Sequence, residues 1–158
     1  DLLSLARHTD VTAGPIDTND WLREGARRWE GPYRDATRTI VVDLDGELPP
    51  MRGHRGRLDQ VLDIALDNAL RHGQGKVTVT ADAPGRHVHI AVADEGPGPA
   101  RVPSAPGQPV GADGKRIGLD LARRIVESEG GRLRLAVNAQ PAVTLILPTA
   151  PTAEDGDE

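Results

Sequence analysis

Apolar residues recur along the chain at two spacings, one typical of helices and one typical of strands. Helical spacing predicts three helices, at residues 21–31, 55–72 and 116–130. The second of these carries one broad apolar stripe, formed by Leu58, Val61, Leu62, Ala65, Leu66, Ala69 and Leu70. β-Branched and alternating runs predict five strands, at residues 37–44, 76–83, 87–94, 130–138 and 142–148.

Glycine and proline predict where these elements end. The first helix is expected to stop at Gly31-Pro32. Segments 11–20 (VTAGPIDTND) and 46–54 (GELPPMRGH) are expected to be connections without strands. Residues 95–115 are rich in Gly and Pro and poor in apolar residues, so we expect a long loop there.

The order of the elements predicts the fold class α+β. Strands in adjacent pairs joined by short turns form a largely antiparallel sheet, and three helices can cover one of its faces. We therefore expect a two-layer α/β sandwich with a mixed, mainly antiparallel sheet. A length of 158 residues suits one domain, and its core must be aliphatic because the chain has no Phe, two Trp and one Tyr.

Composition excludes several classes of protein. The absence of Cys excludes disulfides and thiolate chemistry. A formal net charge of -5 argues against a general nucleic-acid binder, so no nucleic-acid partner is expected. No apolar run is long enough to span a bilayer. The chain begins at Asp1 rather than Met, so we expect a fragment of a longer protein.

A first candidate site lies on the polar side of helix 55–72. Asn68 interrupts otherwise apolar surroundings in LDIALDNAL. A neutral amide oxygen can bind Mg²⁺ without adding charge, and Arg71 and His72 within the next turn can contact phosphate. For a single Asn, a solvent-facing position is the alternative.

A second candidate lies where strand 87–94 enters a glycine turn, ADEGPGPA. Gly96 and Gly98 allow backbone to approach a flat ligand closely, because glycine has no Cβ. The Asp94 carboxylate at the strand end needs a donor, and the exocyclic amine of adenine is a suitable one. An ordinary Asp-Gly turn is the alternative.

A third candidate lies where the long loop enters the last helix. The amides and dipole of a helix N-terminus attract anions. Lys115 and Arg116 add positive charge there, which is unfavourable unless an anion binds. An ordinary helix start with a basic first turn is the alternative.

The three motifs together, in this order and separation, resemble the ATP-binding catalytic domain of bacterial two-component sensor histidine kinases. This is the GHKL superfamily, shared with gyrase, Hsp90 and MutL. LDNALRHG resembles its N box, VADEGPGPA its first glycine box, and GKRIGLDLARRIVESEGGRL its second glycine box with the following helix. The resemblance implies the Bergerat fold, Mg²⁺ at Asn68, the adenine amine at Asp94, and phosphate cradled by amides around Gly118 and Leu119.

The same resemblance implies a division of the chain. Residues 1–16 would be the end of a dimerisation and phosphotransfer helix with its linker. Residues 17–149 would be the ATP-binding domain, with a lid at 96–114. Residues 150–158 would be a disordered acidic tail.

Four positions depart from the family pattern. Ile64 stands where many members have a second Asn or an acid, His54 replaces an Asp, Arg116 replaces a Gly, and Pro141 replaces a Thr. The lid also lacks its aromatic box. Ile64, Arg116 and Pro141 favour an alternative function, a degenerate module with weak or no nucleotide binding that acts through protein contacts.

The activity implied by the resemblance is ATP-dependent protein histidine kinase. The domain would bind Mg-ATP and donate the γ-phosphoryl to a histidine of a phosphotransfer domain, for relay to a response-regulator aspartate. The five histidines of the chain all lack the setting of an H box, so the acceptor is expected upstream or on a separate chain. No catalytic residue is therefore assigned within the chain itself.

The expected partners are the phosphotransfer domain and the response regulator. The expected location is the cytoplasm, as one domain of a protein anchored in the membrane through other parts. An anti-sigma-type serine kinase of the same superfamily is a further alternative. The helix-like start DLLSLARHTD argues against it.

Overall fold

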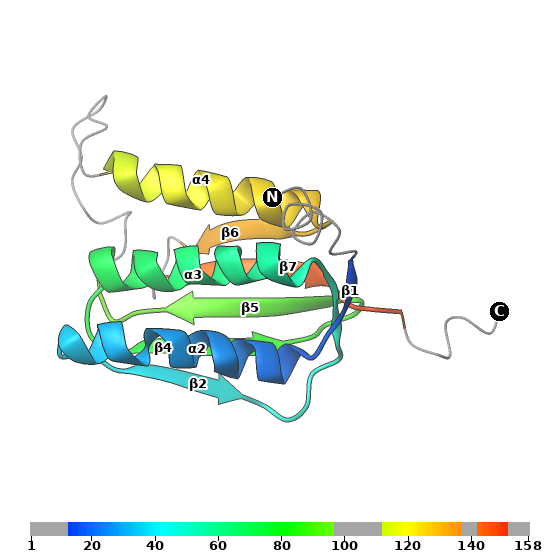
Figure 1. Cartoon of the computed structure of the whole chain (residues 1–158), viewed down its shortest axis with the longest axis horizontal. Coiled ribbons are helices and arrows are strands. Elements are labelled where there is room, and N and C mark those ends of the chain that lie inside the picture. Colours follow the sequence, from blue (N-terminus) through cyan, green and yellow to red (C-terminus); the bar gives the residue numbers. More distant parts are fainter. Residues whose placement is uncertain (1–12, 97–111, 137–141, 152–158) are drawn as a thin grey trace, which may run out of the picture.

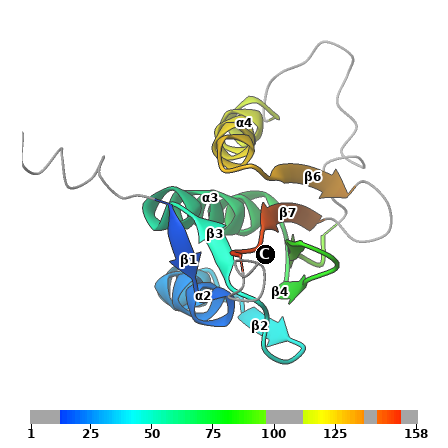
Figure 2. The ribbon, with the colours of Figure 1, turned by 90° about the vertical axis from the view of Figure 1, so that its right-hand side faces the viewer.

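Three helices lie side by side over one face of a five-stranded sheet (Figures 1 and 2). The computed structural model describes residues 13–96, 112–136 and 142–151. The helices are α2 (Thr18–Asp35), α3 (Arg55–His72) and α4 (Ala112–Ser128). In spatial order the strands are β2 (Ile40–Leu44), β4 (Val77–Asp82), β5 (His87–Ala93), β7 (Ala142–Pro148) and β6 (Arg132–Ala136). The predicted two-layer α+β sandwich is confirmed.

The sheet is mixed and mainly antiparallel, as predicted. Strand β2 runs parallel to β4, and α3 lies in the connection between them. The β4–β5, β5–β7 and β6–β7 pairs are antiparallel. Because β5 is central, its alternate side chains enter the core. Asp94 is the residue that follows β5, so it lies at the edge of the layer.

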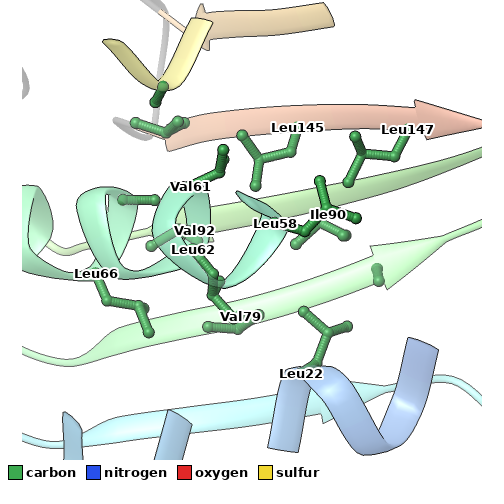
Figure 3. Close-up of a cluster of buried hydrophobic side chains, with 14 of the residues drawn as sticks. Leu22, Leu58, Val61, Leu62, Leu66, Val79, Ile90, Val92, Leu145 and Leu147 are labelled. Atoms are coloured by element: carbon green, nitrogen blue, oxygen red, sulfur yellow. The ribbon is translucent and has the colours of Figure 1, made fainter. Parts of the chain in front are cut away.

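The core forms between the helices and the inner face of the sheet. Side chains of α3 lie over β5 and β7, with Leu22 of α2 beside β4 (Figure 3). Six of the seven predicted stripe residues of α3 are buried, and Leu70 packs against the same cluster half-buried. The buried residues are mostly aliphatic, as the composition requires. The stripe fixes which face of α3 is left for polar side chains.

A second, two-stranded sheet was not predicted. Strand β1 (Gly14–Ile16) pairs antiparallel with β3 (Met51–Gly53), where the sequence indicated two connections. Each strand has only three residues, which is too short for the sequence to reveal a period of two. Burial of Ile16 and Met51 against the main core holds the pair in place.

Helix α2 continues past the predicted stop at Gly31-Pro32. Pro32 lies within the last turn, and the helix ends at Asp35. Proline removes one helical hydrogen bond and usually breaks a helix. Here the following residue, Tyr33, is fully buried and donates its hydroxyl hydrogen to the Leu66 carbonyl, 2.7 Å away. Packing of this tyrosine therefore keeps the last turn helical.

Tyr33 predicts a loss of stability in alkali. Burial raises the pKa of Tyr33 above its ordinary value of 10.0, although Arg38 opposes the shift. The folded state therefore favours the neutral phenol. The contribution of Tyr33 to the free energy of unfolding is complete below pH 10, and it is lost at higher pH, where the phenol of the unfolded chain ionises. We expect Tyr33→Phe to lower the free energy of unfolding by about 1 kcal/mol at neutral pH.

Denaturant titrations of both proteins between neutral pH and pH 11 measure this effect, and the difference is expected to shrink above pH 10. Because Tyr33 is the single tyrosine of the chain, phenolate absorbance reports on it alone. Ionisation at the ordinary pKa in the still-folded chain would contradict the account.

The start of α3 is stabilised from outside the helix. Its N-cap His54 makes no capping hydrogen bond with its side chain, and the first turn has no acidic residue. Instead Glu129, just after α4, lies 2.8 Å from His54 Nδ1 and accepts from the His54 amide at 3.3 Å. The Glu129 side chain is 3% exposed. A carboxylate at this end complements the α3 dipole and ties α3 to α4.

The end of the domain is packed rather than free. Thr149 forms a bridge to Met51, and the Ala150 amide donates to the Pro50 carbonyl at 2.8 Å. The disordered tail was predicted to begin at residue 150, but Ala150 is buried. Residues 152–158 lie outside the described residues. Within the described residues, no helix combines the length and apolarity needed to cross a membrane.

Candidate functional site

Three element ends meet at one end of the layer. The C-terminal end of α3, the N-terminal end of α4 and the end of β5 all lie at the left in Figure 1. The helices α3 and α4 run in opposite directions there and contact each other. All three motifs selected from the sequence belong to these ends.

A cavity of about 420 Å³ opens between α3 and α4. Its lining residues are Ile64, Asp67, Asn68, Arg71, His72, Gly118 and Leu119. It brings together five of the predicted site residues from two motifs that lie some fifty residues apart in the sequence. The binding roles assigned to those residues remain predictions.

Helical periodicity explains how α3 presents its part of the cavity. Ile64, Asn68, Arg71 and His72 lie four, three and one residues apart, which places them along one side of the helix. The apolar stripe faces the sheet, so this side faces α4. A Cβ at Gly118 would lie 3.5 Å from Ile64 Cγ2, so Ile64 forms the wall that meets α4.

Charge at the cavity is arranged around one ion pair. Arg71 Nε lies 2.9 Å from Asp67 Oδ1, a pair four residues apart on α3. The Arg71 side chain is 71% exposed, so its remaining donors face solvent at the mouth of the cavity. His72 is also exposed and takes part in an interaction. The rim can therefore offer positive charge and donors to an anion.

Asp94 lies beside the end of α3 and not among the residues that line the cavity. It is half-buried, and its Oδ1 accepts from the amides of Gly96 at 2.6 Å and Gln74 at 3.3 Å. Oδ2 has no hydrogen bond within the described residues. A Cβ at Gly96 would lie 2.9 Å from Oδ1, so this glycine is needed for packing on Asp94.

Gly73 is a functional candidate to which the sequence analysis gave no role of its own, although it ends the motif LDNALRHG. Its backbone is extended, with φ -92 and ψ -175, so helix termination does not require glycine. A Cβ there would lie 2.6 Å from both Cγ and Oδ2 of Asp94. Glycine at this position leaves room for the carboxylate. No signal in the sequence couples these two positions.

The start of α4 was predicted four residues too late. The helix begins at Ala112, so Gly118 and Leu119 lie beyond its first turn, where amides bond to helical carbonyls. They are not at a helix N-terminus as expected. Lys115 and Arg116 lie in α4, and their side chains are outside the description. Gly98 and Pro141 lie outside the described residues, as does most of the predicted lid.

The donor set limits how a metal could be held. No group of three or more His, Cys, Asp or Glu side chains in the described ranges could bind a metal ion. The cavity offers the Asn68 amide, with Asp67 paired to Arg71. One amide oxygen fits Mg²⁺ that takes its other ligands from water and phosphate, since Mg²⁺ dehydrates reluctantly.

Known proteins are similar to this chain in sequence and in fold. Residues 53–151 match the family described as Histidine kinase-, DNA gyrase B-, and HSP90-like ATPase. The sensor histidine kinase component HK1 of Mycobacterium tuberculosis is 30% identical over 146 residues, covering 85% of this chain and 84% of the relative. The alginate biosynthesis sensor protein KinB of Pseudomonas aeruginosa is 31% identical over 154 residues, covering 89% of this chain and 25% of the relative.

Solved structures agree on the fold. The catalytic domain of histidine kinase ThkA superposes with a TM-score of 0.73 at 22% identity, covering 87% of this chain and 95% of that domain. Full-length ShkA, in complex with AMPPNP, superposes with a TM-score of 0.72 at 27% identity, covering 90% of this chain and 32% of ShkA.

Fold and motifs define a catalytic ATP-binding domain of the sensor histidine kinase class. The matched residues are well over half of the chain, and the chain belongs to the histidine kinase-, DNA gyrase B- and HSP90-like ATPase family. It spans less than half the length of several relatives, KinB among them.

Proposed function

We propose that this chain binds Mg-ATP and donates the γ-phosphoryl group to a histidine on a phosphotransfer domain. The observation that carries the proposal is the cavity lined by Asn68, Arg71 and His72 against α4. Asp94 packs against Gly73, the residue that follows His72. The complex of the relative ShkA with AMPPNP, an ATP analogue, supports the proposal.

Each end of the nucleotide has a proposed binding group. Asp94 Oδ2 accepts from the adenine amine, while Oδ1 is held by backbone amides. Arg71 and His72 contact the phosphates at the mouth of the cavity. Asn68 holds Mg²⁺, which when bound neutralises charge on the phosphates. Lys115 and Arg116, which belong to α4, add positive charge for the phosphates.

The chain supplies position and electrostatics, and its partner supplies the nucleophile. Phosphoryl transfer needs little covalent chemistry from the protein that holds ATP. An acceptor histidine attacks the γ-phosphorus, the bond to the β–γ bridging oxygen breaks, and ADP leaves. The phosphoryl group then passes to an aspartate of a response regulator. We place this domain in the cytoplasm, with any membrane anchor in other parts of the protein.

Asn68→Ala tests the proposed metal end of the site. We expect phosphoryl transfer from ATP to the acceptor histidine to fall by about tenfold or more, since loss of a positioning contact slows transfer strongly. The magnesium dependence of nucleotide affinity should also weaken. Radiolabelled ATP and the full-length protein give the first readout, and calorimetric titration with and without Mg²⁺ gives the second.

The matched control is Gln60→Ala, which removes an exposed amide from the same helix, outside the cavity. It should leave both measurements unchanged. If Asn68→Ala retained full transfer and full magnesium dependence, the proposed metal role would be wrong.

A further inference from the structure

The loop between α3 and β4 is held on its sheet side by the end of β5. The Gln74 amide donates to Asp94 Oδ1 at 3.3 Å, and the Gln74 carbonyl accepts from the Glu95 amide at 2.9 Å. The Lys76 amide donates to Glu95 Oε1 at 2.7 Å. Gly75 has φ +67, and a Cβ there would collide with the Glu95 carboxylate. The loop and the Asp94 carboxylate are therefore one hydrogen-bonded unit.

One arginine holds the same loop from the opposite side. Arg38 comes from the segment between α2 and β2, and its Nε donates to the Gly75 carbonyl at 2.9 Å. Its Nη1 donates to the carbonyls of Ala69 at 3.1 Å and Leu70 at 2.7 Å, in the last turn of α3. Its guanidinium lies 5.5 Å from the centre of the Tyr33 ring. Arg38 thus fixes the loop relative to the end of α3.

The geometry requires a guanidinium rather than any positive charge. A guanidinium holds its donors on three nitrogens in a rigid planar fork, whereas an ammonium group carries all three of its donors on one nitrogen. Arg38 Nη2 is buried without a hydrogen-bond partner in the described residues, which is unfavourable. One donor of the Arg38 guanidinium is unused, so its presence is accounted for by the bonds that its other nitrogens make to the loop and to the last turn of α3.

We propose that Arg38 is a positioning residue that makes the site selective for purines with an amino group at position 6. It acts through Gly75 and Gln74 on the orientation of Asp94, and it does not touch the ligand. The inference rests on the proposed function, in which Asp94 accepts from the adenine amine. Without Arg38, the Gly75 carbonyl loses a hydrogen bond and the loop shifts. Asp94 Oδ2 then no longer points toward the position of the adenine amine.

The test is a selectivity ratio. Dissociation constants are measured for ATP and for purine riboside triphosphate, which lacks the exocyclic amine, using the wild-type chain, Arg38→Met and Arg38→Lys. We expect the wild type to prefer ATP and Arg38→Met to lose at least three-fold of that preference. Arg38→Lys should recover only part of it, because an ammonium carries all its donors on one nitrogen and cannot reproduce the separate Nε and Nη1 bonds.

Arg34→Met is the matched control, since it removes an exposed arginine from the last turn of α2. It should leave the ratio unchanged. Equal affinity of the wild type for both nucleotides would refute the role of Asp94 itself. If the wild type discriminates and Arg38→Met weakens both nucleotides equally, Arg38 is only structural and the inference fails. Should Arg38→Met not fold, Arg38→Lys alone decides, and an unchanged ratio overturns the inference.

Discussion

Asp94→Asn is expected to raise the dissociation constant for ATP by about 30- to 150-fold, corresponding to about 2 to 3 kcal/mol for a lost hydrogen bond to a charged group. The substitution is clean, because an Asn Oδ1 can still accept from the amides of Gly96 and Gln74. What changes is the other atom, since an NH₂ group replaces Oδ2 and presents donors to the adenine amine. Calorimetric titration with ATP measures the effect.

Asp82→Asn is the matched control, because it neutralises an exposed aspartate on β4 of the same sheet. It should bind ATP as the wild type does, and both variants should unfold at similar denaturant concentrations. Wild-type affinity in Asp94→Asn would show that adenine does not bind at this carboxylate.

Gly73→Ala is expected to weaken ATP binding nearly as much as Asp94→Asn, by about 30-fold, although Gly73 itself offers no group to the ligand. The added Cβ would lie 2.6 Å from Asp94 Cγ and Oδ2, and 2.5 Å from the Ala69 carbonyl oxygen. The carboxylate must move away or the end of α3 must shift. Such overpacking also destabilises a fold by about 1 to 3 kcal/mol.

Gly56→Ala is the matched control, because it also replaces a glycine next to or within α3 by alanine, but its added Cβ meets nothing within 4 Å. Its affinity for ATP should equal that of the wild type. Equal affinities of Gly73→Ala and Gly56→Ala would mean that the space at Gly73 plays no part in binding. Thermal unfolding of both variants shows whether Gly73→Ala remains folded at the temperature of the titration.

The layers of the fold could be predicted because they depend on local pattern. The stripe on α3 and the alternation of β4 and β5 are long enough to fix helix, strand and inward face. The β1–β3 pair and the last turn of α2 depend instead on distant contacts. Ile16 and Tyr33 are buried by elements far away in the sequence, which no local window contains.

The candidate site could be predicted only where a residue stands out from its local sequence. Asn68 and Asp94 are polar residues in apolar surroundings, and each ends up at the same end of the layer. Gly73 and Arg38 have no such signal, because their importance comes from bonds and distances between segments. The start of α4 was misplaced because residues 112–115 lack the apolar spacing of a helix.

Binding of Mg-ATP by this chain is the central claim, and a calorimetric titration of the wild-type chain with ATP, with and without Mg²⁺, tests it most directly. We predict saturable binding of one ATP per chain that strengthens when Mg²⁺ is present. Absence of binding by ATP and ADP in the millimolar range with Mg²⁺, in a chain shown to be folded, would contradict the account.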